Sequence, residues 1–289
     1  MAAIIWGFAF VAQKVGMEFI GPFLFNGIRF IMGSLILVPI VIYMKSKKDN
    51  SVKSDKKNNY YFGLILGTIL FLASSAQQIG MVSTTAGNAG FITGLYVIFV
   101  PIFGIILKQI VPKIIWPAAA MAIAGLYLLS VKEGFTMSVG DVWVSISAIL
   151  WAVHVLLVSH LSKQIDPVFL ALQQFIVCGV LSLITAFSFE IVNINSIFLA
   201  WGPLLYGGIL SVGVAFTLQV VGQKHAHPAS ASLLLSSESL FAAIGGWLIL
   251  NELMSMRALL GCVFILSGII LVQVYQYYSY KKLSLKKSS

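Results

Sequence analysis

Long apolar runs without period-two alternation constrain the fold of this chain most strongly, for example at residues 23–44 and 114–131. A helix that crosses ~30 Å of hydrocarbon needs about 20 apolar residues, whereas a membrane-spanning strand would show about ten residues of alternating hydropathy. Only 9% of the 289 residues are charged, against about 25% in soluble domains. The mean hydropathy is +0.98. We therefore predict an all-α integral membrane protein.

Polar breaks divide the chain into ten predicted transmembrane helices. One sizeable polar insertion, residues 45–59, holds six lysines and two aspartates, and such a segment is expected to be a solvated loop. Residues 281–289 form a basic tail. The predicted helices lie near residues 1–20, 22–44, 60–81, 86–107, 113–131, 139–160, 167–188, 200–222, 228–250 and 256–279.

The lysines and arginines predict the orientation. If the first helix starts in the cytoplasm, fourteen of the 18 fall on cytoplasmic segments, as the positive-inside rule requires. Both termini are then cytoplasmic, in a plasma or inner membrane, with anionic lipid headgroups beside the loop lysines. Nucleic acid is not an expected partner, because these lysines do not form a folded basic face.

The two halves of the sequence resemble each other, which predicts domains at residues 1–135 and 136–280. Five helices in each half is an odd number, so the second half must enter the bilayer upside down. Inverted repeats of this kind build many secondary transporters, with the substrate site near the midplane. Trp6 has five residues before it where Trp151 has ten of its own helix, so we expect the natural chain to extend upstream. The matched pairs are Trp6 and Trp151, Pro22 and Pro167, Phe30 and Phe175 and Ile31 and Ile176 at an offset of 145, and Gly125 and Gly268 at 143.

Four short motifs follow one another along the chain: WGFAFVAQK at residues 6–14, FNGIRF at 25–30, SESLF at 237–241 and GWLILNE at 246–252. In this order they resemble the motifs of EamA-type members of the drug/metabolite transporter superfamily. The resemblance implies ten helices and the export or exchange of amino acids, metabolites or drugs. The sequence departs from the family pattern at Ser239, Asn251 and Gln109, where proline, glycine and glutamate are usual.

Three charged residues inside predicted helices are candidates for function, because an ionisable group at bilayer depth costs several kcal/mol. Glu238 suits a proton-coupling or cation-binding role, and the alternative is a protonated glutamate that bonds two helices. Arg29 either holds an anionic group of the substrate or reaches the outer interface along its apolar stem. Lys14 presents the same choice. We expect hydroxyl groups of Ser236, Ser237 and Ser239 to hydrogen-bond Glu238.

Neutral polar and aromatic residues recur on several predicted helices and could line a substrate cavity. Amide and aromatic surfaces suit a small zwitterionic or aromatic solute, and the alternative is that the amides bridge helices. His154 is a further candidate proton carrier, since its ordinary pKa is near 6.5. The predicted lining consists of Trp6, Gln77, Gln78, Asn88, Tyr96, Trp151, His154 and Gln219.

These features together predict a secondary active transporter that works by alternating access, with efflux as the direction the resemblance suggests. The sequence lacks a phosphate-binding G-x-x-x-x-G-K-[ST] loop, so ATP is not the expected energy source. No cofactor or metal is expected, because Cys178 and Cys262 lie inside apolar runs. The expected partners are a small-molecule substrate, lipid and protons, in a monomer or a homodimer. The alternatives are a channel or facilitator without coupling and, less favoured, a membrane-embedded enzyme.

Overall fold

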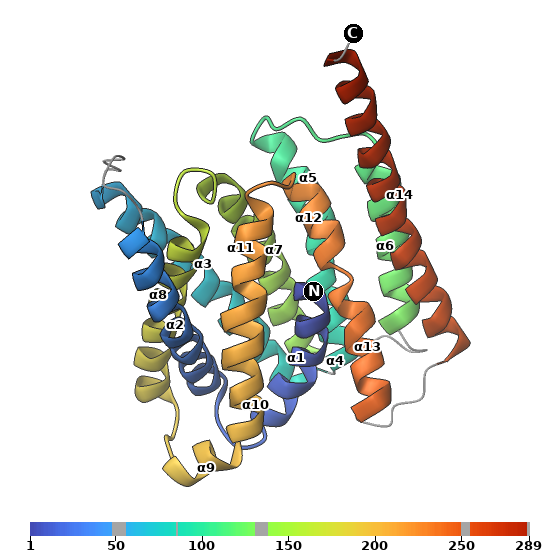
Figure 1. The fold of residues 1–289 in the computed structure, drawn as a ribbon. Coiled ribbons are helices and arrows are strands. Elements are labelled where there is room, and N and C mark those ends of the chain that lie inside the picture. The colour runs from blue at the N-terminus through green and yellow to red at the C-terminus, as the bar shows by residue number, and fades with distance from the viewer. Residues whose placement is uncertain (48–55, 85, 131–137, 250–254, 288–289) are drawn as a thin grey trace.

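The computed structural model describes residues 1–47, 56–84, 86–130, 138–249 and 255–287. Every regular element within these ranges is helical, and the helices pack side by side in one bundle (Figure 1). In chain order they are α1 (Ala2–Gly16), α2 (Pro22–Lys47), α3 (Lys56–Ser83), α4 (Ala86–Gly94), α5 (Tyr96–Ile106), α6 (Ile115–Ser130), α7 (Val139–Leu161), α8 (Pro167–Phe189), α9 (Ile194–Leu199), α10 (Trp201–Leu205), the π-helix η1 (Tyr206–Phe216), α11 (Thr217–Gln223), α12 (Pro228–Leu235), α13 (Glu238–Ile249) and α14 (Met256–Lys287).

Eight segments in the described residues are long and apolar enough to cross a membrane, and each coincides with a predicted span. Two shorter apolar helices, Ala2–Gly16 and Ile115–Leu128, fall at the first and fifth predicted spans. The protein is therefore an all-α, multi-pass membrane protein. The count of ten crossings stays a prediction.

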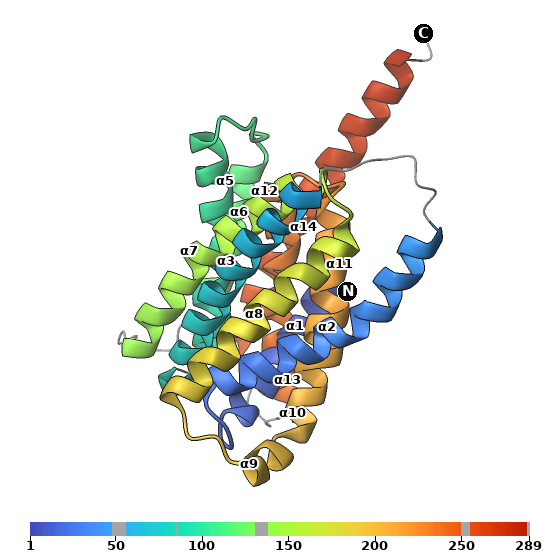
Figure 2. The same ribbon diagram turned by 90° about the vertical axis from the view of Figure 1, so that its left-hand side faces the viewer.

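The helices extend further than the hydropathy pattern predicted. α2 continues to Lys47 and α3 begins at Lys56, so both ends of the predicted loop at 45–59 are helical. α14 likewise continues through most of the predicted tail at 281–289, and its C-terminal end projects beyond the bundle (Figure 2). Lysine is a good helix former, so charge alone does not end these helices. Residues 48–55, Lys132, Asn251, Glu252 and the predicted boundary at 135/136 lie outside the described residues.

Two of the predicted spans are broken near their middle. Leu95 separates α4 from α5, and Ser236 with Ser237 separates α12 from α13. Broken helices leave carbonyl groups that must find donors within the protein at membrane depth. Ser236 Oγ donates to Leu233 O at 2.8 Å and Ser237 Oγ donates to Leu234 O at 2.7 Å. The two serine hydroxyls thus stabilise the break, because they bond backbone carbonyls of α12.

The final helices of the two predicted halves, α6 and α14, lie side by side (Figures 1 and 2). A Cβ atom on Gly125 would lie 2.5 Å from Gly261 O, and one on Gly268 would lie 2.7 Å from Ala118 O. Gly125 and Gly268 are 143 residues apart, and so are Ala118 and Gly261. The same close approach therefore occurs twice, with the two helices exchanged.

Gly125→Ala should destabilise the protein, because the added methyl group has no space between α6 and α14. Overpacking of this kind costs about 1–3 kcal/mol, so the midpoint of thermal unfolding in detergent should fall. Gly222→Ala is the matched control, since no atom lies within 4 Å of the Cβ position there. Equal midpoints for the two variants would contradict the close approach.

Candidate functional site

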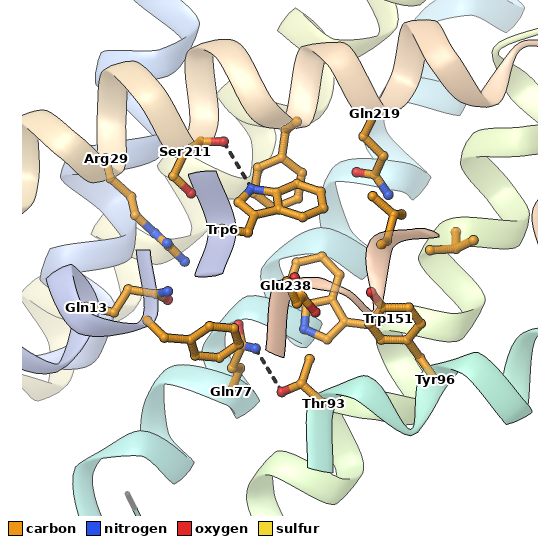
Figure 3. Close-up of a pocket in the computed structure, with 14 residues that line it drawn as sticks. Trp6, Gln13, Arg29, Gln77, Thr93, Tyr96, Trp151, Ser211, Gln219 and Glu238 are labelled. Atoms are coloured by element: carbon orange, nitrogen blue, oxygen red, sulfur yellow. Dashed lines mark hydrogen bonds between the residues drawn. The ribbon is translucent and has the colours of Figure 1, made fainter. Parts of the chain in front are cut away.

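A cavity of about 40 Å³ lies within the bundle (Figure 3). Small-molecule sites are mostly apolar with a few placed polar groups, and the lining of this cavity has the same character. Its lining comes from both predicted halves of the chain. The lining residues are Trp6, Phe10, Gln13, Arg29, Gln77, Thr93, Tyr96, Trp151, Val155, Ser211, Phe216, Gln219, Leu235 and Glu238.

Most of the residues that the sequence singled out meet at this cavity. Trp6, Gln77, Tyr96, Trp151 and Gln219 line it, together with Arg29 and Glu238. Gln78, Asn88, His154 and Lys14 are not among the lining residues.

The four predicted residues outside the lining have different surroundings. Lys14 Nζ donates to Met81 O at 2.8 Å and Thr84 O at 3.1 Å, so its charge lies against the carbonyl end of α3. His154 is fully buried behind the cavity wall, where its Nε2 pairs with Gln174 Oε1 at 2.8 Å. Gln78 is fully buried on α3, and Asn88 is partly buried on α4.

Aromatic rings form one side of the cavity around Phe216, the last residue of the π-helical segment η1. The ring of Phe216 lies 4.6 Å from that of Trp6 and 5.8 Å from that of Trp151, between centroids. The Trp6 indole N–H donates to Ser211 O of the same segment at 3.2 Å. π-helical turns occur frequently at functional sites, and this one places a carbonyl and an aromatic ring at the cavity.

Glu238 is the first residue of α13, directly after the break from α12. It is 5% exposed, and its Oε1 atom has no hydrogen-bond partner among the described residues. The Tyr96 hydroxyl lies beside this carboxyl group (Figure 3). The carboxyl group therefore lies at the cavity with bonding capacity that the chain leaves unused.

The three serines around Glu238 do not hydrogen-bond its carboxyl group, contrary to our expectation. Ser236 and Ser237 donate to carbonyls of α12, and Ser239 Oγ donates to Gly90 O of α4 at 2.7 Å. The physical reason is the break itself, because serine hydroxyls readily bond carbonyls three or four residues back. Ser239 instead links α13 to α4, which belong to the two broken spans.

Arg29 places a cation at the same cavity. It is 2% exposed, and its Nε donates to Asn26 Oδ1 at 3.0 Å. The guanidinium carbon lies 5.0 Å from the ring centroid of Phe30 and 5.6 Å from that of Phe25. Within the described part of the chain no carboxylate forms an ion pair with Arg29. Figure 3 shows the guanidinium group beside Gln13, away from Glu238.

Five polar or aromatic lining residues were not predicted: Phe10, Gln13, Thr93, Ser211 and Phe216. Gln13 follows Trp6 by seven residues, which is two helical turns, so a helical-face comparison with Trp6 could have found it. Thr93 accepts a hydrogen bond from Gln77 Nε2 at 3.0 Å, and nothing in the sequence links the two residues. Ser211 reaches the site through its backbone carbonyl, which no side-chain pattern reports.

Comparison with known proteins agrees with this architecture. The sequence model of the EamA-like transporter family matches residues 1–131 and 138–274. An uncharacterized transporter from Archaeoglobus fulgidus is 29% identical over 279 residues, which is 95% of this chain and 84% of the relative. The uncharacterized transporter YoaV from Bacillus subtilis is 26% identical over 274 residues, 92% of each chain. One solved crystal structure covers 95% of this chain and 96% of its own with a TM-score of 0.71 at 16% identity, and is therefore similar in fold.

A bundle of membrane-spanning helices around a small-molecule cavity, with transporters as relatives, defines a membrane transporter. The chain belongs to the EamA-like transporter family.

Proposed function

We propose that this protein is a secondary active transporter that exports or exchanges small zwitterionic metabolites, such as amino acids, by alternating access. One observation carries the proposal: a buried cation and a buried carboxyl group share one small cavity without forming an ion pair with each other. Arg29 would bind the carboxylate of the substrate and Glu238 its ammonium group. Trp6, Trp151 and Phe216 would contact its apolar part.

Unpartnered polar atoms around the cavity support this assignment. Gln13 Oε1, Gln219 Oε1 and Glu238 Oε1 are buried acceptors without a donor, and the Trp151 indole N–H is a buried donor without an acceptor, among the described residues. A buried polar atom left without a partner costs about 1–3 kcal/mol. A solute with both an ammonium and a carboxylate group would satisfy atoms of both kinds.

We propose that alternating access depends on two inverted five-helix halves, residues 1–135 and 136–280. The family model matches the two halves separately, and the close approach of α6 and α14 repeats with the helices exchanged. Packing of α1 against α13 likewise has a counterpart in the packing of α7 against α4 and α5. Two related halves on either side of the cavity would open it alternately by rocking against each other.

Proton coupling through Glu238 is the finer part of the proposal. A carboxyl group that releases its proton when the substrate ammonium arrives would couple the movement of protons to the movement of substrate. Gln77, Tyr96 and Gln219 would position the substrate near it. We further propose that the protein resides in the cell membrane with both termini in the cytoplasm, because the lysine distribution favours that orientation.

Substrate recognition can be tested with an amino-acid library, because a bound solute raises the thermal stability of the folded protein. Arg29→Gln should weaken binding of the stabilising amino acids and leave binding of their α-carboxamide analogues unchanged. A lost charged hydrogen bond is worth about 1.5–3 kcal/mol, which is roughly ten- to a hundredfold in affinity.

Arg257→Gln is the matched control for this measurement, since Arg257 lies over the Tyr127 ring at 5.1 Å and does not line the cavity. Equal weakening by the two variants would contradict a carboxylate site at Arg29. Saturable counterflow of the labelled solute in proteoliposomes is expected from a carrier, and ohmic conductance would overturn the transporter mechanism.

Glu238→Gln should abolish accumulation driven by a pH gradient and retain counterflow exchange, because the amide cannot carry the proton. Both rates are measured in proteoliposomes with the solute identified above. Glu18→Gln is the control, since Glu18 is exposed and outside the cavity. Unchanged gradient-driven accumulation in Glu238→Gln would refute the coupling role.

The orientation can be tested by labelling single cysteines in a Cys178→Ala/Cys262→Ala background. Asn195→Cys lies in the exposed helix α9, and Ser284→Cys lies near the end of α14. A membrane-impermeant maleimide added to intact cells should label Asn195→Cys and not Ser284→Cys. The reverse pattern would show that the C-terminus is outside.

A further inference from the structure

A second hollow lies at one end of the bundle, where three helix connections meet. The connection from α5 to α6 contributes Gln109 and Ile110, and the connection from α11 to α12 contributes Lys224 to Pro228. Ser159 and His160 at the end of α7, and Lys163 directly after it, complete the lining. This hollow has a volume of about 570 Å³ and opens outward. We call it the vestibule.

The vestibule is lined by basic residues. Two lysines, Lys163 and Lys224, and three histidines line it, and no acidic residue is among its lining residues. Lys163 follows α7 and Lys224 follows α11, so the two charges line different sides of the vestibule. In a hollow lined by one sign of charge, field lines are focused and the local concentration of counter-ions rises.

One of the histidines is a structural element of the vestibule. His227 Nε2 bonds Ile110 O at 3.0 Å, and its Nδ1 accepts the N–H of Ala229 at 3.3 Å. This bonding fixes the neutral form of the ring, and burial together with Lys163 holds the pKa of His227 below its usual range. His227 therefore joins two connections, and the lysines supply the charge.

The vestibule and the central cavity lie next to each other along two helices, α7 and α11. On α7, Val155 lines the cavity and Ser159 lines the vestibule; on α11 and its end, Gln219 lines the cavity and Lys224 the vestibule. At a rise of 1.5 Å per residue, these steps correspond to only about 6 Å and ~7.5 Å along the helix axes. About one helical turn separates the two spaces.

The intervening turn of α11 contains a polar residue with no structural partner. Gln223 is 2% exposed, and neither of its side-chain amide atoms has a hydrogen-bond partner among the described residues. Buried amides are normally hydrogen-bonded, and Gln223 lies on α11 between Gln219 of the cavity and Lys224 of the vestibule, although it lines neither space.

We propose that the vestibule is a second binding site, for small organic carboxylates, from which a solute enters or leaves the central cavity past Gln223. Its role in transport rests on the proposed function, whereas the binding itself does not. Lys163 and Lys224 bind the carboxylate, and the short intervening turn is the barrier that opens.

The four histidines of the chain provide separate reporters for the two sites. His160, His225 and His227 line the vestibule, whereas the His154 ring lies edge-on to Trp151 of the central cavity at 5.5 Å between centroids. We would titrate ¹³C-histidine-labelled full-length protein in detergent with benzoate, and with benzamide as the neutral analogue, at one fixed pH. Benzoate should shift the vestibule signals saturably, and benzamide should not.

Lys163→Gln/Lys224→Gln should weaken benzoate binding at the vestibule histidines at least fivefold. Lys108→Gln/Lys113→Gln removes the same charge from the same end of the molecule outside the lining, and should change the affinity less than twofold. Equal effects of the two double variants would overturn the site and leave a general basic surface.

Arg29→Gln separates this inference from the proposed function. Benzoate that also binds at Arg29 in the central cavity would shift the His154 signal. Loss of that His154 shift in Arg29→Gln, with the vestibule shifts intact, supports two sites. Loss of the vestibule response in Arg29→Gln would overturn the second site. Displacement of benzoate by phosphatidylglycerol, and not by phosphatidylcholine, would assign the vestibule to a lipid headgroup and overturn its assignment to free carboxylates.

Discussion

The structure depends on one constraint: a polar group at membrane depth has no water to bond and must find its partner in the protein. The broken helices show how the chain meets it. Ser236 and Ser237 bond carbonyls of α12, and Ser239 bonds Gly90 O across to α4. Lys14 meets the same requirement at the end of α3, where it bonds three carbonyls. These bonds let the chain interrupt its helices beside the cavity.

The cavity is one place where the constraint is left unmet. Glu238, Trp151 and Gln219 line it and keep buried atoms without partners among the described residues. Each such atom costs about 1–3 kcal/mol, so together they favour a solute that supplies the missing bonds. Gln223 adds two unpartnered amide atoms on α11, at a position between Gln219 of the cavity and Lys224 of the vestibule.

Much of the fold could be predicted from hydropathy, because in a bilayer the length of an apolar run directly reports the length of a helix. The breaks at Leu95 and Ser236–Ser237 could not, since each lies inside a segment whose overall hydropathy predicts a single span. The site was predicted in part. Glu238 and Arg29 are conspicuous because a charge inside an apolar run is rare. Gln77 and Gln78 are indistinguishable by type, and only Gln77 lines the cavity, because neighbouring residues face different directions on a helix.

The sequence by itself determined that the chain is a helical membrane protein, and it supplied a short set of buried polar residues. The length of an apolar run and the placement of charges are properties of the local sequence, and they act on the position of a segment in the bilayer without tertiary contacts. Only the tertiary structure decided which of these residues meet. The rotation of each helix is set by close contacts such as Gly125 against Gly261. Those contacts place Lys14 on backbone carbonyls, His154 behind the wall, and Arg29 and Glu238 on one cavity.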